Sequence, residues 1–281
     1  MRNGLYPLFF IAIACKGPVD DPVVPTDLRI DHAAADNDPD SIYTEMCVND
    51  DGGVFVAWVD DRDGKFDVWF NRSLDAGRTW MPSAVKVSHG PGNSYAPSVG
   101  CENNVVYVAW EDDRDGELEN RNIYFYRSSE DVGNLGETWQ GEDLLLEVDE
   151  DGLSMSRVPK VATSGSYVHV AWMDNLNDAY DIFVASSDNM GESFSEPVRA
   201  DGDQPGASWS GYPKIEATPD DVFVVWEDNR DGASDIYMAV SRNHGKDFRS
   251  DRRIDRGDSR GQYNSYAPSF DVDGDTVYVV W

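Results

Sequence analysis

Aspartate and arginine recur along the chain two residues apart, in the pairs Asp60 and Arg62, Asp112 and Arg114, and Asp228 and Arg230. A carboxylate and a guanidinium at this spacing can form a bidentate ion pair, and the same groups can line a polar ligand site. One binding site needs different residues from each contributing segment. Recurrence in three places therefore favours ion pairs that brace adjacent repeats, with a ligand-face role as the alternative.

Three other residues could contact a ligand directly. Arg157, in Arg157-Val158-Pro159, could bind a carboxylate. Tyr95 and Tyr266 lie in identical Asn-Ser-Tyr-Ala-Pro-Ser segments and could stack on a sugar ring. Each has a structural alternative, because Arg157 belongs to the repeat described below and the tyrosines could pack between repeats.

The chain is strongly acidic, with 53 aspartates and glutamates against 23 lysines and arginines, a net charge of −30. Such a field repels phosphate backbones and anionic lipid, which excludes nucleic acid as a partner and charge-driven binding to membranes. It also repels an anionic sugar unless a local basic pocket overrides it. Clustered carboxylates suit calcium, so calcium is a possible ligand. The four histidines and three cysteines give no zinc pattern, and we expect no other cofactor.

A repeat must position these residues. Five segments of four mostly apolar residues end in Trp58, Trp110, Trp172, Trp226 and Trp281. Four of these tryptophans lie thirteen residues after a proline, and Glu45 takes the proline's place before Trp58. After Asp-Gly turns, segments follow in which apolar and polar residues alternate. This combination is typical of antiparallel hairpins. We therefore expect repeated β-sheets with the tryptophans in the core.

A second turn closes each repeat, with serine first, then Asp or Asn, Gly, and an aromatic residue. An Asp or Asn side chain can accept hydrogen bonds from turn amides, and glycine readily takes a positive φ. The residues of this pattern are Asp75, Gly77 and Trp80; Asp131 and Trp139; Asn189, Gly191 and Phe194; and Asn243, Gly245 and Phe248.

This turn resembles the Asp-box, or BNR repeat, of the sialidase (neuraminidase) superfamily. The resemblance implies an all-β propeller of four-stranded antiparallel blades, usually six, of which this sequence holds four complete and one partial. It also implies that the Asp-boxes are structural and lie opposite the ligand face. Sialidases hold a substrate carboxylate with three arginines, and Arg157 resembles the arginine of their Arg-Ile-Pro motif. The other repeats have Tyr43, Tyr95, Gly211 and Tyr266 at that place, so no second arginine is evident.

The N-terminus is typical of a targeting segment. Residues 1–14 combine Arg2 with a short apolar run, and the segment ending at Cys15 resembles the lipobox of bacterial lipoproteins, whose cysteine is lipidated. The alternatives are an ordinary secretory signal or no export. Residues 15–26 then form a tether, and residues 27–281 the propeller. In an oxidising compartment Cys47 and Cys101 could pair, or both could remain free.

The segment Leu28–Asp31 resembles Arg252–Asp255, an expected outer strand, and the fifth repeat stops inside its second strand. These features predict an incomplete ring, so we expect the sequence to be a fragment of a longer protein. The predicted function is an exported, lipid-anchored binding or scaffold module, with a glycan or protein ligand and no membrane contact beyond the anchor. The predicted location is the bacterial outer membrane or cell surface, or else the periplasm or the medium. The alternative function is a sialidase-like glycoside hydrolase, an exo-sialidase.

Overall fold

The computed structural model describes residues 30–31, 40–115, 120–129, 135–139, 141–147, 154–274 and 276–281. All regular elements in this part of the chain are β-strands, and nothing there forms an apolar helix of membrane-spanning length. The predicted signal peptide, Cys15 and the tether lie outside the described residues.

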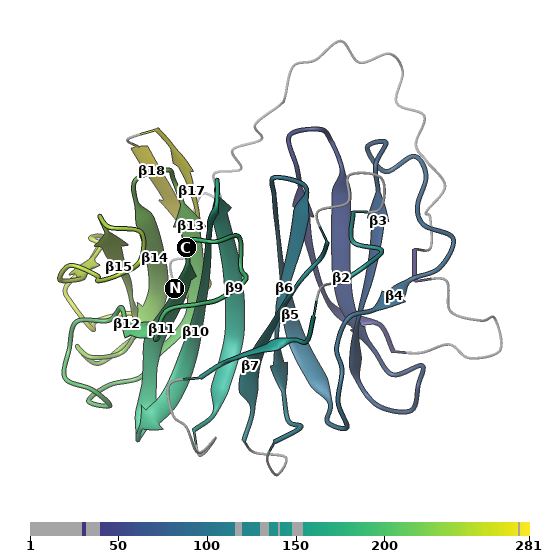
Figure 1. The fold of residues 1–281 in the computed structure, drawn as a ribbon. Helices are drawn as coiled ribbons and strands as arrows, with labels where there is room; N and C mark the ends of the chain where they lie inside the picture. Colours follow the sequence, from purple (N-terminus) through teal and green to yellow (C-terminus); the bar gives the residue numbers. More distant parts are fainter. Residues whose placement is uncertain are drawn as a thin grey trace, which may run out of the picture.

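The strands form five antiparallel sheets that follow one another in chain order (Figure 1). Sheet 1 contains β1 (Ile42–Val48), β2 (Val54–Asp60), β3 (Asp67–Ser73) and β4 (Val85–Lys86). Sheet 2 contains β5 (Ser94–Glu102), β6 (Val105–Asp112), β7 (Asn122–Arg127) and β8 (Leu144–Leu146). Sheet 3 contains β9 (Ser156–Ser164), β10 (Tyr167–Asn177), β11 (Ala179–Ser187) and β12 (Val198–Arg199). Sheet 4 contains β13 (Ser210–Ala217), β14 (Val222–Asp228), β15 (Asp235–Ser241) and β16 (Arg252–Arg253), and sheet 5 only β17 (Ser269–Asp273) and β18 (Thr276–Val280).

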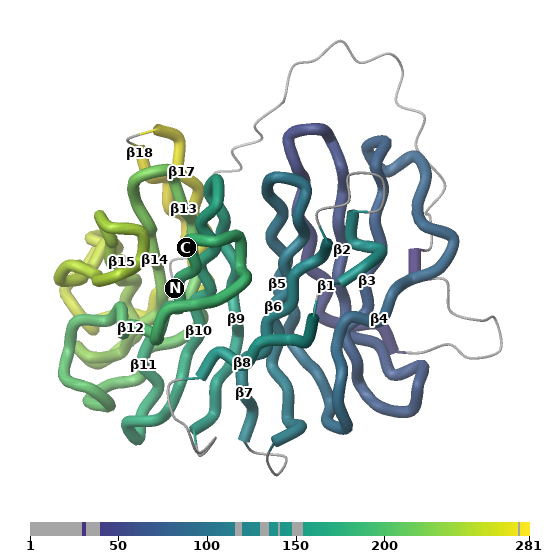
Figure 2. Tube along the Cα trace, in the orientation of Figure 1, coloured from purple at the N-terminus to yellow at the C-terminus, as the bar shows by residue number. Residues whose placement is uncertain are grey.

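The first strand of each sheet is its inner strand, and consecutive inner strands are neighbours: β1 contacts β5, β5 contacts β9, and β9 contacts β13. The tube view shows the same succession, with β17 beside β13 (Figure 2). The expected arrangement of four complete sheets and one partial sheet is confirmed for the described residues.

The hydrophobic core lies between adjacent sheets. One cluster joins Phe55 and Phe70 of sheet 1 with Val108 and Trp110 of sheet 2, and comparable clusters join each later pair of sheets. The repeated tryptophans of the first four sheets are at most 3% exposed, as expected. Trp281 departs from this expectation and is 54% exposed, because sheet 5 has no third strand among the described residues to cover it.

Each complete sheet has a β-bulge near the start of its inner strand. The pairing shifts between Ile42 and Glu45, and likewise after Tyr95, Arg157 and Gly211, so these four starting positions are equivalent. Tyr43 is therefore equivalent to Val158 and Tyr212, not to Tyr95 as the sequence suggested.

The same pairing corrects the position of Glu45. Glu45 pairs with Ala57 as Ser98 pairs with Ala109, which leaves Thr44 in the proline's place. The sequence count was wrong because five residues join Val48 to Val54, whereas four join Cys101 to Val106.

Cys47 of β1 and Cys101 of β5 form a disulfide, with their Cα atoms 6.1 Å apart. The sequence left open whether these cysteines pair or remain free, and in the structure they pair. The bond joins the inner strands of sheets 1 and 2.

Of the outer strand expected at residues 28–31, only Ile30 and Asp31 lie within the described residues. Ile30 and Asp31 belong to no strand, and their carbonyl oxygens accept hydrogen bonds from the side chains of Asn71 (2.7 Å) and Arg62 (2.9 Å). These two residues therefore lie against sheet 1, where side chains of that sheet bind their carbonyl oxygens.

Candidate functional site

A pocket of about 510 Å³ opens where the bulged ends of β1, β5, β9 and β13 meet. Its polar lining comprises Glu45, Glu111, Arg121, Arg157 and Lys160, and its aromatic lining comprises Tyr43, Tyr95 and Tyr212. Because these residues come from four different sheets, no single repeat could have made the site.

Glu111, at the end of β6, organises one wall of the pocket. Its side chain is buried, its Oε1 accepts a hydrogen bond from the Val158 amide at 2.9 Å, and its Oε2 lies 2.6 Å from Arg121 Nη1. Arg157 Nε lies 3.7 Å from the same Oε2. One buried carboxylate thus orients two guanidinium groups from sheets 2 and 3 at the pocket wall.

Sheet 4 contains a matched position without this chemistry. Glu227 follows Trp226 as Glu111 follows Trp110, and its Oε1 accepts a hydrogen bond from the Ala267 amide at 2.7 Å. Burial raises the pKa of Glu227, and the amide hydrogen bond opposes that shift. No ion pair to Glu227 is present among the described residues, since Ser234 and Tyr266 stand where sheets 2 and 3 have arginines. The carboxylate–amide contact is therefore repeated architecture, and the arginines are specific to the pocket.

The bulges place tyrosines at the rim. Tyr43, Val158 and Tyr212 have positive φ values of 53°, 54° and 52°. The equivalent residues of sheets 2 and 5, Ala96 and Ala267, also have positive φ, 44° and 52°. Positive φ is unfavourable for residues with a side chain, and especially for β-branched valine. Its recurrence in every sheet shows that the bulge is part of the fold, while the side chains that it presents differ from sheet to sheet.

Tyr95 lies beneath Arg121, whose guanidinium carbon is 4.0 Å from the ring centroid. Burial raises the pKa of the Tyr95 hydroxyl, and the nearby Asp113 carboxylate adds to the shift. The phenol is therefore neutral at physiological pH and can act as a hydrogen-bonding group. Tyr266 is 54% exposed and does not line this pocket.

At the axial side of the pocket Lys160 forms an ion pair with Glu45, which links β9 to β1. Lys214 occupies the equivalent position on β13, as the strand registers show. Burial and the neighbouring Lys160 lower the pKa of Lys214, and Glu45 opposes that effect. Glu45 is thus the direct partner of Lys160 only, while both groups act electrostatically on Lys214.

The Asp-x-Arg pairs lie at the turns between second and third strands and do not line this pocket. Arg114 contacts both carboxylate oxygens of Asp112, lies over the Tyr124 ring at 3.8 Å, and pairs with Asp143 at 2.7 Å. Arg230 makes the same contacts with Asp228, Tyr237 and Asp251, and Arg62 with Asp60 and Trp69. Burial alone would raise the pKa of Asp228, but hydrogen bonds from Arg230 hold it below its ordinary value. These pairs brace strands within one sheet, rather than adjacent repeats as the sequence suggested.

The Ser-x-Asp turns lie at the opposite ends of the sheets, since Ser73 pairs with Val54 at the far end of β2 from Asp60. Ser73 Oγ donates to Asp75 Oδ1 at 2.7 Å, and Asp75 Oδ1 accepts from the Thr79 amide at 2.7 Å. Asn189 and Asn243 accept equivalent hydrogen bonds. Gly77, Gly191 and Gly245 have positive φ, and Trp139 and Phe194 pack against Phe70 and Phe125, respectively. Asp131 lies outside the described residues.

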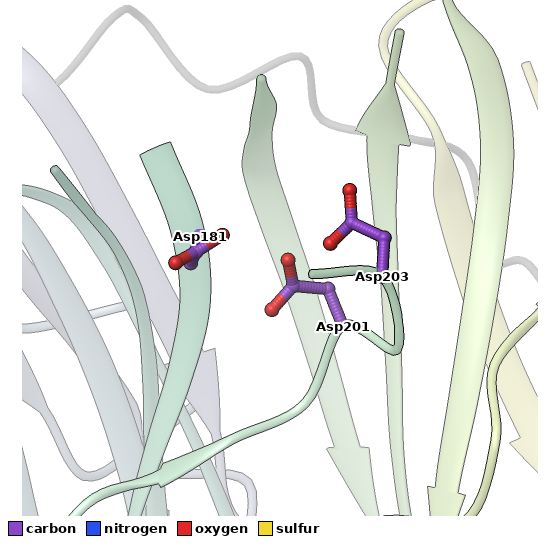
Figure 3. Close-up of side chains that lie close together, drawn as sticks. All are labelled: Asp181, Asp201 and Asp203. Carbon is purple, nitrogen blue, oxygen red and sulfur yellow. The ribbon is translucent and has the colours of Figure 1, made fainter. Parts of the chain in front are cut away.

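Three carboxylates gather at the outer side of sheet 3, where Asp181, Asp201 and Asp203 place oxygens within 4.8 Å of one another (Figure 3). Arg199 pairs with all three, so a cation there would have to displace a guanidinium. Burial raises the pKa of Asp201 to about 7 despite Arg199. Arg253 joins Asp235, Asp255 and Asp258 of sheet 4 in the same way, which indicates a repeated ion-pair network. Calcium binding by this chain stays a prediction.

Of the residues singled out in the sequence, the pocket brings together Arg157 and Tyr95. Sequence reasoning missed Glu111, Arg121, Lys160 and Tyr212. The Trp-Glu pairs at Trp110 and Trp226 were a visible signal for Glu111. The positions of the other three follow from bulges and sheet packing that no local motif reveals.

No family profile matches this sequence, and no curated protein is significantly similar to it. Solved structures do resemble it. An ulvan lyase of polysaccharide lyase family 25 superposes with a TM-score of 0.55 at 15% identity, over 76% of this chain and 56% of that one. A Hadza microbial sialidase gives 0.54 at 15% identity, over 75% and 46%, and the endosialidase of phage phi92 gives 0.55 at 10% identity, over 84% and 50%.

The chain has a sialidase-like β-propeller fold. At these identities the similarity concerns the fold alone. The matches cover about half the length of those three structures. In this sialidase-like propeller the sheets are the blades, and the pocket lies where their inner strands meet.

Proposed function

We propose that this propeller binds a sugar bearing an anionic group in the pocket around Glu111. The observation that carries the proposal is the local charge: Arg121, Arg157 and Lys160 line the pocket against the carboxylates of Glu45 and Glu111. The lining thus has one excess positive charge in a chain of net charge −30, and its short-range attraction for an anion is screened by salt less than the surrounding long-range field.

The aromatic lining supports a sugar as the occupant. Tyr43 and Tyr212 are 59% and 49% exposed, and Tyr95 lies beside them in the same lining. Tyrosine combines an apolar face with a hydroxyl, which suits the alternating apolar and polar surfaces of a pyranose. The similar structures include a sialidase and a polysaccharide lyase, which is compatible with a carbohydrate ligand.

The test is a titration of the protein with N-acetylneuraminic acid, glucuronic acid and neutral methyl glucoside, in which saturation-transfer NMR detects binding. We expect an acidic sugar to bind and the neutral one not to bind, with Arg157→Ala weakening binding about tenfold, as for loss of one charge-assisted hydrogen bond. Arg242→Ala removes the same charge at a 51% exposed side chain paired with Asp221, outside the pocket, and serves as the control. Equal binding by the two variants, or no preference for acidic sugars, contradicts the proposal.

Hydrolysis is less well supported by the geometry. Glycoside hydrolases of the usual kind need two carboxyl groups, one of them protonated to act as the acid. Here the two carboxylates that line the pocket are ion-paired, Glu111 with Arg121 and Glu45 with Lys160. We therefore propose a binding protein, and we expect no release of a fluorescent leaving group from a sialoside. Release that Arg157→Ala abolishes would instead establish the exo-sialidase alternative.

Export and lipid anchoring through Cys15 belong to the same proposal, on the sequence of residues 1–15. Metabolic labelling with a radioactive fatty acid tests this part. We expect label on the wild type and none on Cys15→Ala, and equal labelling of the two would contradict a lipid anchor.

A further inference from the structure

The inner strands beside the pocket carry a second pair of cations, separate from the arginines held by Glu111: Lys160, which lines the pocket, and Lys214, which lies next to the lining residues Lys160 and Tyr212 without lining the pocket itself. Lys160 and Lys214 occupy the same register on the adjacent strands β9 and β13, immediately after the bulge. In sheets 1 and 2 this position is taken by Glu45 and Ser98. Among the four complete sheets, sheets 3 and 4 therefore place lysines at this position on neighbouring inner strands, near enough for Lys160 to influence Lys214 electrostatically.

The charges of this group do not balance. Lys160 pairs with Glu45, whereas the Lys214 ammonium has no hydrogen bond or ion pair among the described residues, although its side chain is half-buried. Placing a half-buried ammonium beside a second one is unfavourable unless an anion compensates. The lowered pKa of Lys214 has this cause, first burial and then Lys160.

We propose that Lys160 and Lys214 form a second anion subsite, which takes a tetrahedral oxyanion such as a sulfate or phosphate substituent of the sugar. A tetrahedral oxyanion has several acceptor oxygens and can bridge two ammonium groups that approach from neighbouring strands. The inference rests on the proposed sugar-binding function and makes the ligand doubly anionic, with one group at Arg121 and Arg157 and the other at the lysines.

Glu45 is the competitor within this subsite. The Glu45 side chain is 42% exposed. It belongs to β1 of sheet 1 and pairs with Lys160 of sheet 3, although sheet 2 lies between these sheets in chain order. An incoming oxyanion would replace the Glu45 carboxylate on Lys160. Removing the charge of Glu45 should therefore strengthen anion binding, a direction that general damage to the fold would not produce.

The experiment uses inorganic sulfate, inorganic phosphate and acetate as probes at constant ionic strength. Lysines of the full chain are reductively methylated with ¹³C-formaldehyde, which keeps their charge, and their NMR signals are assigned by single Lys→Arg variants. We expect saturable shifts of the Lys160 and Lys214 signals with sulfate or phosphate, weaker shifts with acetate, and none at the exposed Lys246. Whichever of sulfate and phosphate binds more tightly identifies the substituent.

Matched variants complete the test. Lys214→Gln should weaken sulfate binding at Lys160 about tenfold, Glu45→Gln should strengthen it about threefold or more, and Lys246→Gln should leave it unchanged. Unshifted Lys160 and Lys214 signals, or equal effects of the three variants, overturn the inference. This outcome is separate from failure of the proposed function, which is measured by acidic-sugar binding and its loss in Arg157→Ala.

Discussion

Glu111 and Glu227 occupy the same position in two sheets and differ in what surrounds them. Both accept a hydrogen bond from the amide of a positive-φ residue of the next sheet: Val158 on β9 for Glu111, and Ala267, just before β17, for Glu227. Only Glu111 also holds arginines. Two repeats thus contain a buried carboxylate that binds a backbone amide, and the arginines of sheets 2 and 3 make one of these carboxylates part of the pocket wall.

Replacing Glu111 by Gln should destabilise the protein by about 1–3 kcal/mol, because Arg121 and Arg157 lose a buried counter-charge while partial exposure of both limits the cost. Glu227→Gln should cost less than about 1 kcal/mol, since the amide oxygen can still accept the Ala267 hydrogen bond. Urea unfolding of both variants checks the difference. Equal losses would mean that the arginines gain nothing from Glu111.

Strands and turns were largely predictable from the sequence, and the pocket was not. Asp-Gly turns and the apolar-to-tryptophan segments identified the hairpins because strand period and turn chemistry are local properties. The bulges depend on pairing between strands, which a count along the sequence does not include. For this reason Glu45 was placed one residue out of register, and Tyr43 was matched to Tyr95, from the sequence alone. Arg121 and Lys160 could not be assigned to one site because inter-sheet packing brings them together.

One element carries a buried histidine where the other sheets carry an aromatic ring. His169 of β10 stands in the place of Phe55, Tyr107 and Phe223, is 1% exposed, and its Nδ1 lies 2.8 Å from Ser186 Oγ. Burial, with a smaller effect of His244, lowers the pKa of His169 to about 4. The folded state thus resists protonation, which the unfolded chain accepts near its ordinary pKa of 6.5.

The pKa shift of His169 contributes about 3 kcal/mol to the free energy of unfolding. This contribution is present in full above about pH 6.5 and is lost as the pH falls toward about 4. His169→Phe should remove this share of the pH dependence. Urea unfolding from about pH 7.5 to about pH 4.5 measures it as the difference between wild type and variant. Parallel profiles would show that His169 does not titrate as described.

The disulfide ties β1 to β5 across 54 residues of chain. Constraining an unfolded loop of this length stabilises the folded state by up to about 4 kcal/mol in the chain-entropy description. We expect the Cys47→Ala, Cys101→Ala double variant to unfold at correspondingly lower urea concentration. Reduction of the wild type should reproduce the loss, and a reductant should leave the double variant unchanged. An unaltered midpoint in the double variant would contradict a stabilising role.

At the scale of the whole molecule, a net charge of −30 opposes compaction. The arginine ion pairs are short and partly buried, so salt screens them less than it screens the long-range repulsion. The melting temperature should therefore rise by about 3 °C, equivalent to about 1 kcal/mol, between about 20 mM and about 300 mM NaCl. A melting temperature that falls with salt would show that the ion pairs outweigh the repulsion.

The Lys160–Glu45 ion pair also bears on the order of events in folding. Its partners are 115 residues apart and belong to sheets 1 and 3, whereas units of a linear repeat array contact only their neighbours. Bringing such distant residues together is entropically unfavourable until sheet 2 has folded and shortened the path between them. The pocket is consequently expected to form late in folding: a chain emerging from its N-terminus has sheets 1 and 2 before it has the pocket, which needs the residues of sheet 3.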